Sequence, residues 1–460
     1  MLWSLKEIYK ALDLKMEITK DFYFKNISTD TRTISNGSFF IPIEGANFDG
    51  HKFVDQASDL GVKASLVEKQ KQHLIKNKKI HQILVDNSKD ALKKIAEYSR
   101  KRIKTLTVIC ITGSTGKTTL KEWTKEILKN RFIIHYSKGN FNNEIGMPIT
   151  LANMPKKTRI CILELGMNKP GEIDCLTKIA KPNISIITNI GLAHIGNFKF
   201  KDDIAKEKSD ILNYLTPEGT AILPGDSDYS KMLCDKAKSL TKNVLTFGST
   251  NLCDFNFSDQ GEKEIIFSIL GEKISFKQND YFINWKKNVV IILGLLKVFK
   301  LTLSDFKKFV EKLEPLQGRG EKILLNIKEK KILLIDESYN SSPNSLEDAL
   351  INLVKLKSNY KRLILIIGDM LELGKMSQKF HLNSIKKIIS LYPDLIITSG
   401  KQTQSIYEQL PKSFNKVHIN NYKAIFKKLI KYLRDKDIIM IKGSNSTNLC
   451  KITNLLKEEL

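Results

Sequence analysis

The chain has 460 residues, a length that favours two to four domains. Its hydrophobic content of 42% excludes wholesale disorder, and no apolar run approaches the roughly 20 residues that a membrane span needs. The formal charge of +25 comes mostly from lysine spread over the whole sequence, without a zinc-finger, RNP or helix-turn-helix signature. We therefore expect a cytoplasmic protein with a solvated, lysine-rich surface, and we do not expect nucleic acid as its ligand.

The first segment, residues 1–84, mixes short strands with helix. Two β-like runs, at 38–42 and 64–67, are bounded by glycine and aspartate turns, and residues 53–60 between them have a helical pattern. This mixture predicts a small α/β domain.

The second segment, residues 85–313, alternates continuous apolar runs with amphipathic helical patterns. Such runs are typical of strands buried on both faces of a parallel sheet, and they lie at 106–111, 159–164, 184–188 and 220–223. Residues 253–280 instead alternate apolar and polar side chains with turns at Gly261 and Gly271, which predicts a small antiparallel excursion.

The third segment, residues 314–460, predicts a second doubly wound unit. Its apolar runs, separated by helical patterns, lie at 332–335, 363–367, 395–398 and 438–441. The fold class is therefore α/β in three domains: a small N-terminal domain, a central parallel-sheet domain and a C-terminal Rossmann-like domain.

A glycine-rich loop follows the apolar run at 106–111 and precedes a helical pattern at 120–129. Strand, loop and helix in this order are the context of a phosphate loop, in which glycines let backbone N–H groups converge on phosphate oxygens at a helix N-terminus. Lys117 is expected to reach the β/γ-phosphates, and Thr118 to ligate Mg²⁺. The G-x-x-G-K-T spacing is two residues shorter than the general pattern. The sequence thus predicts that Mg-ATP is bound by Gly113, Ser114, Thr115, Gly116, Lys117, Thr118 and Thr119.

Two further groups stand at the carboxyl ends of predicted strands, where α/β sheets bind their ligands. Glu164 ends the run at 159–164, and His194 follows the run at 184–188. Either could ligate a metal beside Thr118. By position alone, Glu164 could equally cap the following turn, and a lone histidine is more often structural. Lys206 and Lys208 both fit a solvated helix face.

A series of motifs makes the chain similar to the Mur ligases, the peptide-adding enzymes of peptidoglycan synthesis, over nearly its whole length. The motifs are S-T-D-T-R (28–32), G-A-N-F-D-G-H (45–51), the phosphate loop (112–119), G-N-F-N-N-E-I-G-M-P (139–148), E-L-G-M-N (164–168), P-G-E-I (170–173), T-N-I-G-L-A-H (188–194), G-R-G (318–320), D-E-S-Y-N-S-S-P (336–343), G-D-M-L-E-L-G (368–374) and K-G-S (442–444). The strings G-N-x-N-N, E-L-G-M and D-M-L-E-L-G are those of the member that adds D-alanyl-D-alanine.

This resemblance implies an ATP-dependent ligase that joins D-alanyl-D-alanine to UDP-N-acetylmuramoyl-tripeptide through an acyl phosphate. It implies a substrate-binding N-terminal domain at 1–84, an ATP-binding central domain at 85–313, and a C-terminal domain at 314–460 that closes over ATP and binds the dipeptide. The residues that would contact substrate are Ser28, Thr29, Asp30, Arg32, Gly45, Asn140, Asn142, Asn143, Tyr339 and Asn340.

The resemblance also implies roles around the nucleotide. Two Mg²⁺ ions would be held by Thr118 with Glu164 and by His194 with a carbamoylated lysine, placed at Lys208 with Lys206 as the alternative. Asn288 would face the adenine, Arg319 the γ-phosphate and Asp336 the ribose. The catalytic set is Lys117, His194, Lys208 and Arg319.

The chain departs from the family pattern in three places. Residues 287–291 read K-N-V-V-I instead of H-N-x-x-N, residues 335–343 differ from I-D-D-x-Y-N-A-N-P, and N-S-T follows Ser444. The rivals are another Mur ligase or a folylpolyglutamate synthase with a different amine substrate, a phosphate-loop binding protein without ligation, and, on charge alone, a nucleic-acid-binding protein. We expect a monomer. The third residue of the tripeptide, diaminopimelate or lysine, stays open.

Overall fold

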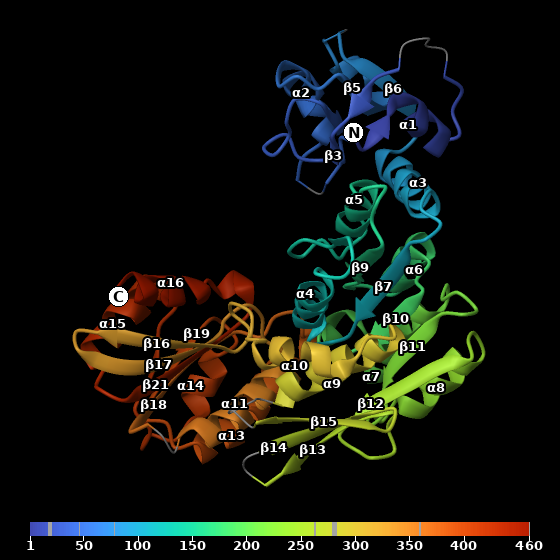
Figure 1. The fold of residues 1–460 in the computed structure, drawn as a ribbon. Helices are drawn as coiled ribbons and strands as arrows, with labels where there is room; N and C mark the ends of the chain where they lie inside the picture. The colour runs from blue at the N-terminus through green and yellow to red at the C-terminus, as the bar shows by residue number, and fades with distance from the viewer. Residues whose placement is uncertain are drawn as a thin grey trace.

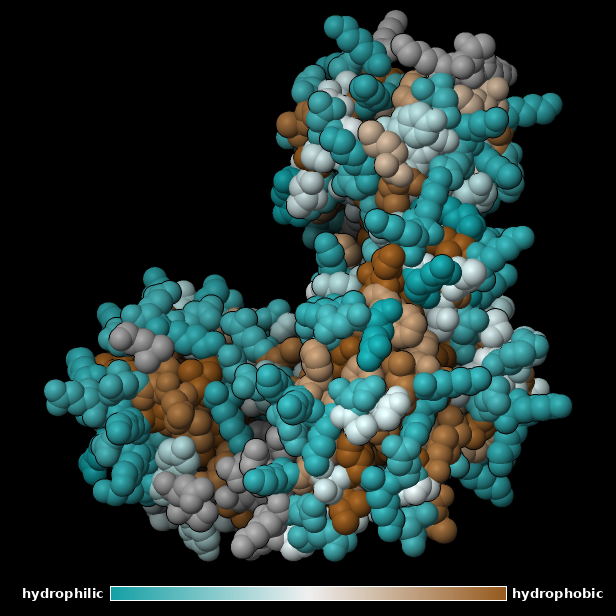
Figure 2. Space-filling model, in the orientation of Figure 1, coloured by the Kyte–Doolittle hydropathy of each residue, from teal (hydrophilic) through white to brown (hydrophobic). Residues whose placement is uncertain are grey.

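The computed structural model describes residues 1–16, 21–45, 47–77, 79–261, 264–277, 283–357 and 360–459. It contains three α/β units along the chain (Figure 1), with the N-terminal unit at one end of the central unit and the C-terminal unit beside the other end. The expected fold class is confirmed. Hydrophilic residues cover most of the face drawn in Figure 2. Within the described residues, no helix has the length and apolarity to cross a membrane.

The N-terminal unit is built on a four-stranded parallel sheet in the order β3-β4-β5-β6, beside a two-stranded antiparallel sheet of β1 and β2. The strand and helix patterns expected at 38–42, 53–60 and 64–67 are confirmed. Its elements are β1 (Trp3–Ser4), α1 (Leu5–Ala11), β2 (Tyr23–Phe24), β3 (Asn26–Ser28), β4 (Ser38–Phe40), η1 (Gly50–Phe53), α2 (Val54–Asp59), β5 (Ala64–Glu68), η2 (Lys69–Leu74), β6 (His81–Val85) and α3 (Ser88–Lys101).

The central unit has a nine-stranded sheet in the order β15-β14-β13-β12-β11-β10-β7-β9-β8, parallel from β8 to β13. The expected antiparallel excursion is confirmed as β13 to β15, which extend this sheet; residues 262, 263 and 278–280 lie outside the described ranges. The elements are β7 (Thr107–Thr112), α4 (Lys117–Leu128), β8 (Ile134–Tyr136), α5 (Gly146–Ala152), β9 (Ile160–Glu164), α6 (Glu172–Ala180), β10 (Ile184–Ile187), η3 (Ile195–Asn197), α7 (Lys201–Ser209), η4 (Asp210–Leu212), β11 (Thr220–Pro224), α8 (Ser230–Lys238), β12 (Asn243–Gly248), β13 (Phe255–Gln260), β14 (Glu264–Ile269), β15 (Glu272–Lys277), α9 (Ile283–Val298) and α10 (Leu303–Glu311).

The C-terminal unit has a six-stranded sheet in the order β16-β17-β21-β18-β19-β20, parallel except for the β16–β17 hairpin. The four expected strands are confirmed as β17, β18, β19 and β21. The elements are β16 (Glu321–Ile327), β17 (Lys330–Glu337), α11 (Pro343–Lys357), β18 (Arg362–Gly368), η5 (Gly374–Met376), α12 (Ser377–Asn383), α13 (Ile385–Ser390), β19 (Leu395–Ser399), α14 (Gln404–Gln409), β20 (Lys416–His418), α15 (Tyr422–Tyr432), β21 (Asp437–Lys442), η6 (Asn445–Thr447) and α16 (Cys450–Glu458).

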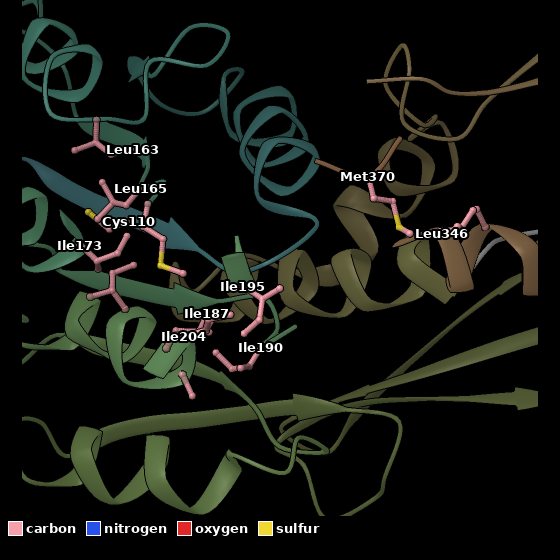
Figure 3. Close-up of a cluster of buried hydrophobic side chains, with 14 of the residues drawn as sticks. Cys110, Leu163, Leu165, Ile173, Ile187, Ile190, Ile195, Ile204, Leu346 and Met370 are labelled. Carbon is pink, nitrogen blue, oxygen red and sulfur yellow. The ribbon is translucent and has the colours of Figure 1, made fainter. Parts of the chain in front are cut away.

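The largest apolar core is continuous between the central and C-terminal units. It joins residues of the strands β7, β9 and β10, such as Cys110 and Ile187, to Leu346 and Met370 of the C-terminal unit. Figure 3 shows Met370 and Leu346 side by side, across from the central-unit side chains. Burial of apolar surface at this junction favours contact between the two units, which brings residues of both to one cleft.

Asn153, directly after α5, joins the central unit to the N-terminal sheet. Its side chain accepts a hydrogen bond from Ile27 N at 2.9 Å and donates to Ile27 O at 2.8 Å, so it pairs with β3 as a neighbouring strand would. Nearby, Trp3 Nε1 donates to Ala152 O at 2.7 Å, and Arg102 Cζ lies 4.0 Å from the centroid of the Trp3 ring. Polar and apolar contacts therefore hold these two units together.

Asn153→Ala is expected to lower the free energy of unfolding by about 1–3 kcal/mol, because both backbone groups of Ile27 lose their partner. Denaturant melts would measure the change. The control is Asn243→Ala, an exposed asparagine whose side chain donates to Glu218 O; it should stay within about 0.5 kcal/mol of the parent. Equal stability of the two variants would show that Asn153 does not join the units.

Candidate active site

The phosphate loop lies between β7 and α4, as the sequence predicts. Gly113 and Gly116 have positive φ angles of 149° and 83°. A Cβ at Gly113 would lie 1.9 Å from Thr188 Oγ1, so a larger residue cannot occupy that position without displacing β10's continuation. Both glycines are therefore required by the path of the loop.

Asn189 anchors the first half of this loop. Its Oδ1 accepts from Ser114 N at 3.0 Å and Thr115 N at 2.9 Å, and Gly191 N donates to Ser114 Oγ at 2.8 Å. The N–H groups at the start of α4, which lack partners within the helix, are then the donors left to meet phosphate oxygens. Ser114 and Thr115 line the cleft, but here their polar groups hold the loop in place.

The half-buried Lys117 and the fully buried Lys208 influence one another electrostatically beside the loop. Lys117 Nζ donates to Gly113 O at 2.6 Å, and Lys208 of α7 has Met167 Sδ as a neighbour at 3.7 Å. Burial lowers the pKa of Lys208 well below its usual value, and the charge of Lys117 lowers it further. Lys206, on the same helix, is exposed. Of the two candidates for carbamoylation, only Lys208 therefore points into the protein.

Glu164 stands at the C-terminal end of β9 and is 3% exposed. Asn142 Nδ2 donates to its Oε1 at 2.9 Å. Its Oε2 is buried without a hydrogen-bond donor, and the nearest cation is Lys121 Nζ at 3.6 Å. A buried carboxylate oxygen with unused acceptor capacity is suited to a cation.

His194 and Glu372 meet across the junction of the central and C-terminal units. His194 Nδ1 lies 2.7 Å from Glu372 Oε2, and this contact lowers the pKa of the Glu372 carboxyl. Gly196 packs backbone to backbone on Gly374: a Cβ at Gly196 would lie 2.3 Å from Gly374 N. His194 and Glu372 both line the cleft that contains the phosphate loop.

Gly196→Ala is expected to push the C-terminal unit away from the central unit, because the added Cβ would meet backbone atoms that cannot rotate aside. Small-angle scattering should then show a larger radius of gyration. Gly271→Ala, in the turn between β14 and β15 with open space around it, should leave that radius unchanged. A parent-like radius for Gly196→Ala would contradict the close approach.

Arg319 reaches the phosphate loop from the start of the C-terminal unit. Its Nη2 donates to Thr118 Oγ1 at 3.0 Å, and its Cζ lies 4.0 Å from the centroid of the Tyr339 ring. The chain enters this unit close by, because Trp123 Nε1 and Trp285 Nε1 each donate to a backbone carbonyl, of Glu314 and Leu313. Arg319 is therefore placed beside the bound phosphates that the loop predicts.

The cleft has two connected parts. One, of about 430 Å³, is lined by Thr118, Glu164, His194, Arg319, the three asparagines 140, 142 and 143, Tyr339 and Asn340. The other contains Thr119, Asn288 and the two tryptophans. Asn288 is buried, and its Oδ1 would lie 3.2 Å from a Cβ at Gly116. This arrangement places Asn288 against the back of the phosphate loop.

Asp336 does not line the nucleotide side of the cleft, unlike its neighbour Glu337. It is buried, and its Oδ1 accepts from Ser338 N at 3.1 Å and from Ser338 Oγ. Its contact with the ribose stays a prediction.

The expected substrate residues of the N-terminal unit surround a separate cavity of about 490 Å³, lined by Thr29, Asp30, Arg32, Gly45 and Phe48 among others. Ser28 lies behind it, with its Oγ bonded to the backbone of Asp30. In the 45–51 motif, Asp49 Oδ1 lies 2.7 Å from His51 Nδ1, and His51 Nε2 accepts a hydrogen bond from Glu68 N, so this pair connects the motif to the end of β5. Ala46 lies outside the described residues.

Glu372, Lys121 and Asn189 are residues that the sequence reasoning did not place in the site. Glu372 belongs to the 368–374 motif, which the sequence shows, but the sequence does not show that Glu372 contacts His194. Lys121 follows Lys117 by one helical turn, a spacing that places both on one face of α4. Asn189 directly follows the strand end that the sequence marked.

The donors fit Mg²⁺ bound together with a nucleotide. Among the described residues, no three His, Cys, Asp or Glu side chains form a ready metal cage. Thr118 and Glu164, whose Oε2 accepts no hydrogen bond, line one cleft beside the phosphate loop. Mg²⁺ typically binds through one or two carboxylates and completes its shell with phosphate oxygens and water.

A parallel sheet with a glycine loop at a helix N-terminus, faced by an arginine from the next unit, defines a phosphate-loop nucleotide-binding protein. Family models match in all three units: the Mur ligase family, catalytic domain at 23–100, the Mur ligase middle domain at 111–284 and the Mur ligase, glutamate ligase domain at 318–445. The chain belongs to the Mur ligase family.

Relatives resemble the chain over nearly its full length. The UDP-N-acetylmuramoyl-tripeptide–D-alanyl-D-alanine ligase of Rickettsia prowazekii is 33% identical, with 99% of each chain covered. The crystal structure of MurF from Acinetobacter baumannii is 26% identical with a TM-score of 0.86, and 99% of each chain is covered. MurF ligase from Thermotoga maritima in complex with ADP is 25% identical with a TM-score of 0.81, covering 94% of this chain and 97% of that one.

Proposed function

We propose that this protein is an ATP-dependent ligase that joins D-alanyl-D-alanine to UDP-N-acetylmuramoyl-tripeptide, a step of peptidoglycan synthesis. The near full-length similarity to a ligase of that name carries the substrate assignment. The geometry supports the reaction class, because one cleft joins a phosphate loop, a buried carboxylate and an arginine from a second unit.

The reaction has two steps. A carboxylate oxygen of the tripeptide attacks the γ-phosphorus of ATP, the bond to the β-phosphate oxygen breaks, and ADP leaves. The amine of the dipeptide then attacks the acyl carbon, loses a proton to solvent or a base, and inorganic phosphate leaves as the amide forms. Both steps move negative charge past the loop, where Lys117 and Arg319 would donate hydrogen bonds to phosphate oxygens in place of their present acceptors, Gly113 O and Thr118 Oγ1.

Mg²⁺ would be held by Thr118 and Glu164, with a second ion at His194 and Lys208, and would neutralise charge on the γ-phosphate. Lys208 would act as a carbamate: its uncharged amine attacks CO₂, a proton leaves, and an anionic oxygen ligand results. The lowered pKa of Lys208 favours this reaction because only the neutral amine is nucleophilic.

Asn288 is proposed to contact the adenine despite the Lys287 and Ile291 changes around it, because Asn288 lies behind Gly116. The cavity at Thr29, Asp30, Arg32 and Gly45 is proposed to hold the uridine nucleotide. Asn140, Asn142, Asn143, Tyr339 and Asn340 are proposed to contact the peptide or the dipeptide in the main cleft. The boundaries at 84 and 313, the monomeric state and the cytoplasmic location stay predictions.

The test is phosphate release from ATP with UDP-N-acetylmuramoyl-tripeptide and D-alanyl-D-alanine, together and singly. We expect stoichiometric phosphate and peptide product only when both substrates are present. Release that is equal without the dipeptide, or that requires a single amino acid instead, would contradict the proposed function. Running the assay with lysine- and diaminopimelate-containing tripeptides would identify the third residue.

A further inference from the structure

Glu372, in the 368–374 string, contacts His194 of the central unit, and no step proposed above uses it. The His194 Nδ1 to Glu372 Oε2 distance is 2.7 Å, with side-chain exposures of 19% and 49%. The contact joins residues 178 positions apart in the sequence, in two different units. It is therefore formed only when the C-terminal unit lies against the central unit.

Backbone contacts place this pair. Gly196 N donates to Glu372 O at 2.9 Å, two residues beyond the histidine. Gly196 and Gly374 approach so closely that neither could carry a Cβ without a clash. His194 and Glu372 themselves have positive φ angles of 64° and 63°, an uncommon backbone conformation for residues other than glycine. Two strained turns thus meet at a defined place.

The turn that carries Glu372 is also fixed within its own unit. Met370 N donates to His381 Nε2 at 2.9 Å, and Leu371 N donates to Ser444 Oγ at 3.1 Å. Ser444 N in turn donates to Asp369 O at 3.0 Å. Glu372 is consequently presented by a rigid loop, so its position follows the position of the C-terminal unit.

A carboxylate in contact with Nδ1 restrains the imidazole ring. The contact occupies the Nδ1 side of the ring and leaves the opposite nitrogen, Nε2, for a ligand. Metal-binding histidines commonly have this carboxylate partner, which fixes the ring and makes the ligating nitrogen more basic. His194 lines the same cleft as Thr118 and Glu164.

We propose that Glu372 is a positioning residue that orients His194 toward the second metal, so that this metal site is completed only when the C-terminal unit is in place. The proposal rests on the proposed function for the presence of a metal at His194. An ion pair that merely holds the two units together is the alternative.

The experiment is a double-mutant cycle on Mn²⁺ binding, measured by electron paramagnetic resonance with the full chain and a non-hydrolysable ATP analogue. The variants are Glu372→Gln, His194→Gln and both together. Glu347→Gln is the matched control, because Glu347 pairs with Lys387 on the outside of the same unit. Small-angle scattering and thermal melts on each variant report whether the units stay together.

We expect Glu372→Gln to weaken binding of the second Mn²⁺ about 10- to 100-fold, the range typical of such partners, with the radius of gyration unchanged. In the His194→Gln background the same change should have less than about a twofold effect, because the residue acts through the histidine. Glu347→Gln should match the parent.

Parent-like Mn²⁺ affinity in Glu372→Gln, or an equal loss in both backgrounds, would overturn the proposal. Weaker Mn²⁺ binding together with a larger radius of gyration would also overturn it, because that result would show that the ion pair only holds the two units together. These measurements need no peptide substrate. A coupled loss of Mn²⁺ in a protein that releases no phosphate with the tripeptide and dipeptide would therefore support the positioning role while refuting the proposed substrates.

Discussion

Lys208→Ala is expected to lower turnover about 1,000-fold, because it removes the oxygen ligand that the proposed carbamate would supply next to the transferred phosphate. Lys208 is 1% exposed, and its Nζ lies 3.7 Å from the thioether sulfur of Met167. Among the described residues, no ion pair with Lys208 offsets the burial of its amine. Burial and Lys117 both lower the pKa of Lys208, which favours the neutral amine that reacts with CO₂.

The Lys208 prediction has a chemical readout besides rate. Small carboxylates such as acetate or propionate should restore part of the lost activity of Lys208→Ala, and protein equilibrated with ¹³CO₂ should show a carbamate carbon that the variant lacks. Lys206→Ala, an exposed neighbour on the same helix, should keep both the signal and the activity. Parent-like turnover in Lys208→Ala would remove Lys208 from the site.

Arg319→Ala is expected to lower turnover about 100- to 1,000-fold and to change nucleotide affinity much less. Arg319 comes from the C-terminal unit and donates to Thr118 Oγ1, whereas the loop that binds the nucleotide belongs to the central unit. Loss of a donor that acts mainly on developing charge lowers the turnover number more than it weakens nucleotide binding.

Single-turnover phosphate release and ADP binding would separate these two effects of Arg319. Arg319→Lys should recover little, since a lysine lacks the planar fork that stacks on Tyr339 while reaching Thr118. Arg131→Ala, an exposed arginine on the central unit, is the control and should behave as the parent. A loss of ADP affinity as large as the loss in turnover would assign Arg319 to ground-state binding instead.

The central strands that the sequence predicted are those whose residues form a continuous apolar run. Each of the continuous apolar runs that became β7, β9, β10 and β11 is buried on both faces, so hydrophobicity alone marks it. The strands β8 and β20 went unpredicted because they are three residues long and half-buried. Strand β16 alternates exposed and buried residues, and its place at a sheet edge depends on pairing with β17.

In the site, too, contiguous motifs could be predicted from the sequence, and contacts between distant residues could not. The phosphate loop is a contiguous motif whose glycines, lysine and threonines lie within seven residues, so its chemistry was visible without a structure. The residues themselves did not separate Lys206 from Lys208, because both lie on one helix; the family resemblance favoured Lys208, and the burial that distinguishes the two lysines is a property of the folded structure. Glu372 and Lys121 were missed for the same reason: their roles come from partners distant in the chain or facing inward.

By itself, then, the sequence determined the α/β class, the three-part organisation, the nucleotide loop and, through its motifs, the family. Those properties follow from local periodicity and contiguous residues. The tertiary structure decided which lysine is buried, which N–H groups of the loop remain for phosphate, and that His194 meets Glu372 and Thr118 meets Arg319. The physical reason is that a parallel sheet collects the ends of strands from distant parts of the chain at one edge, and burial at the junction of two units brings a further set of side chains to the same cleft.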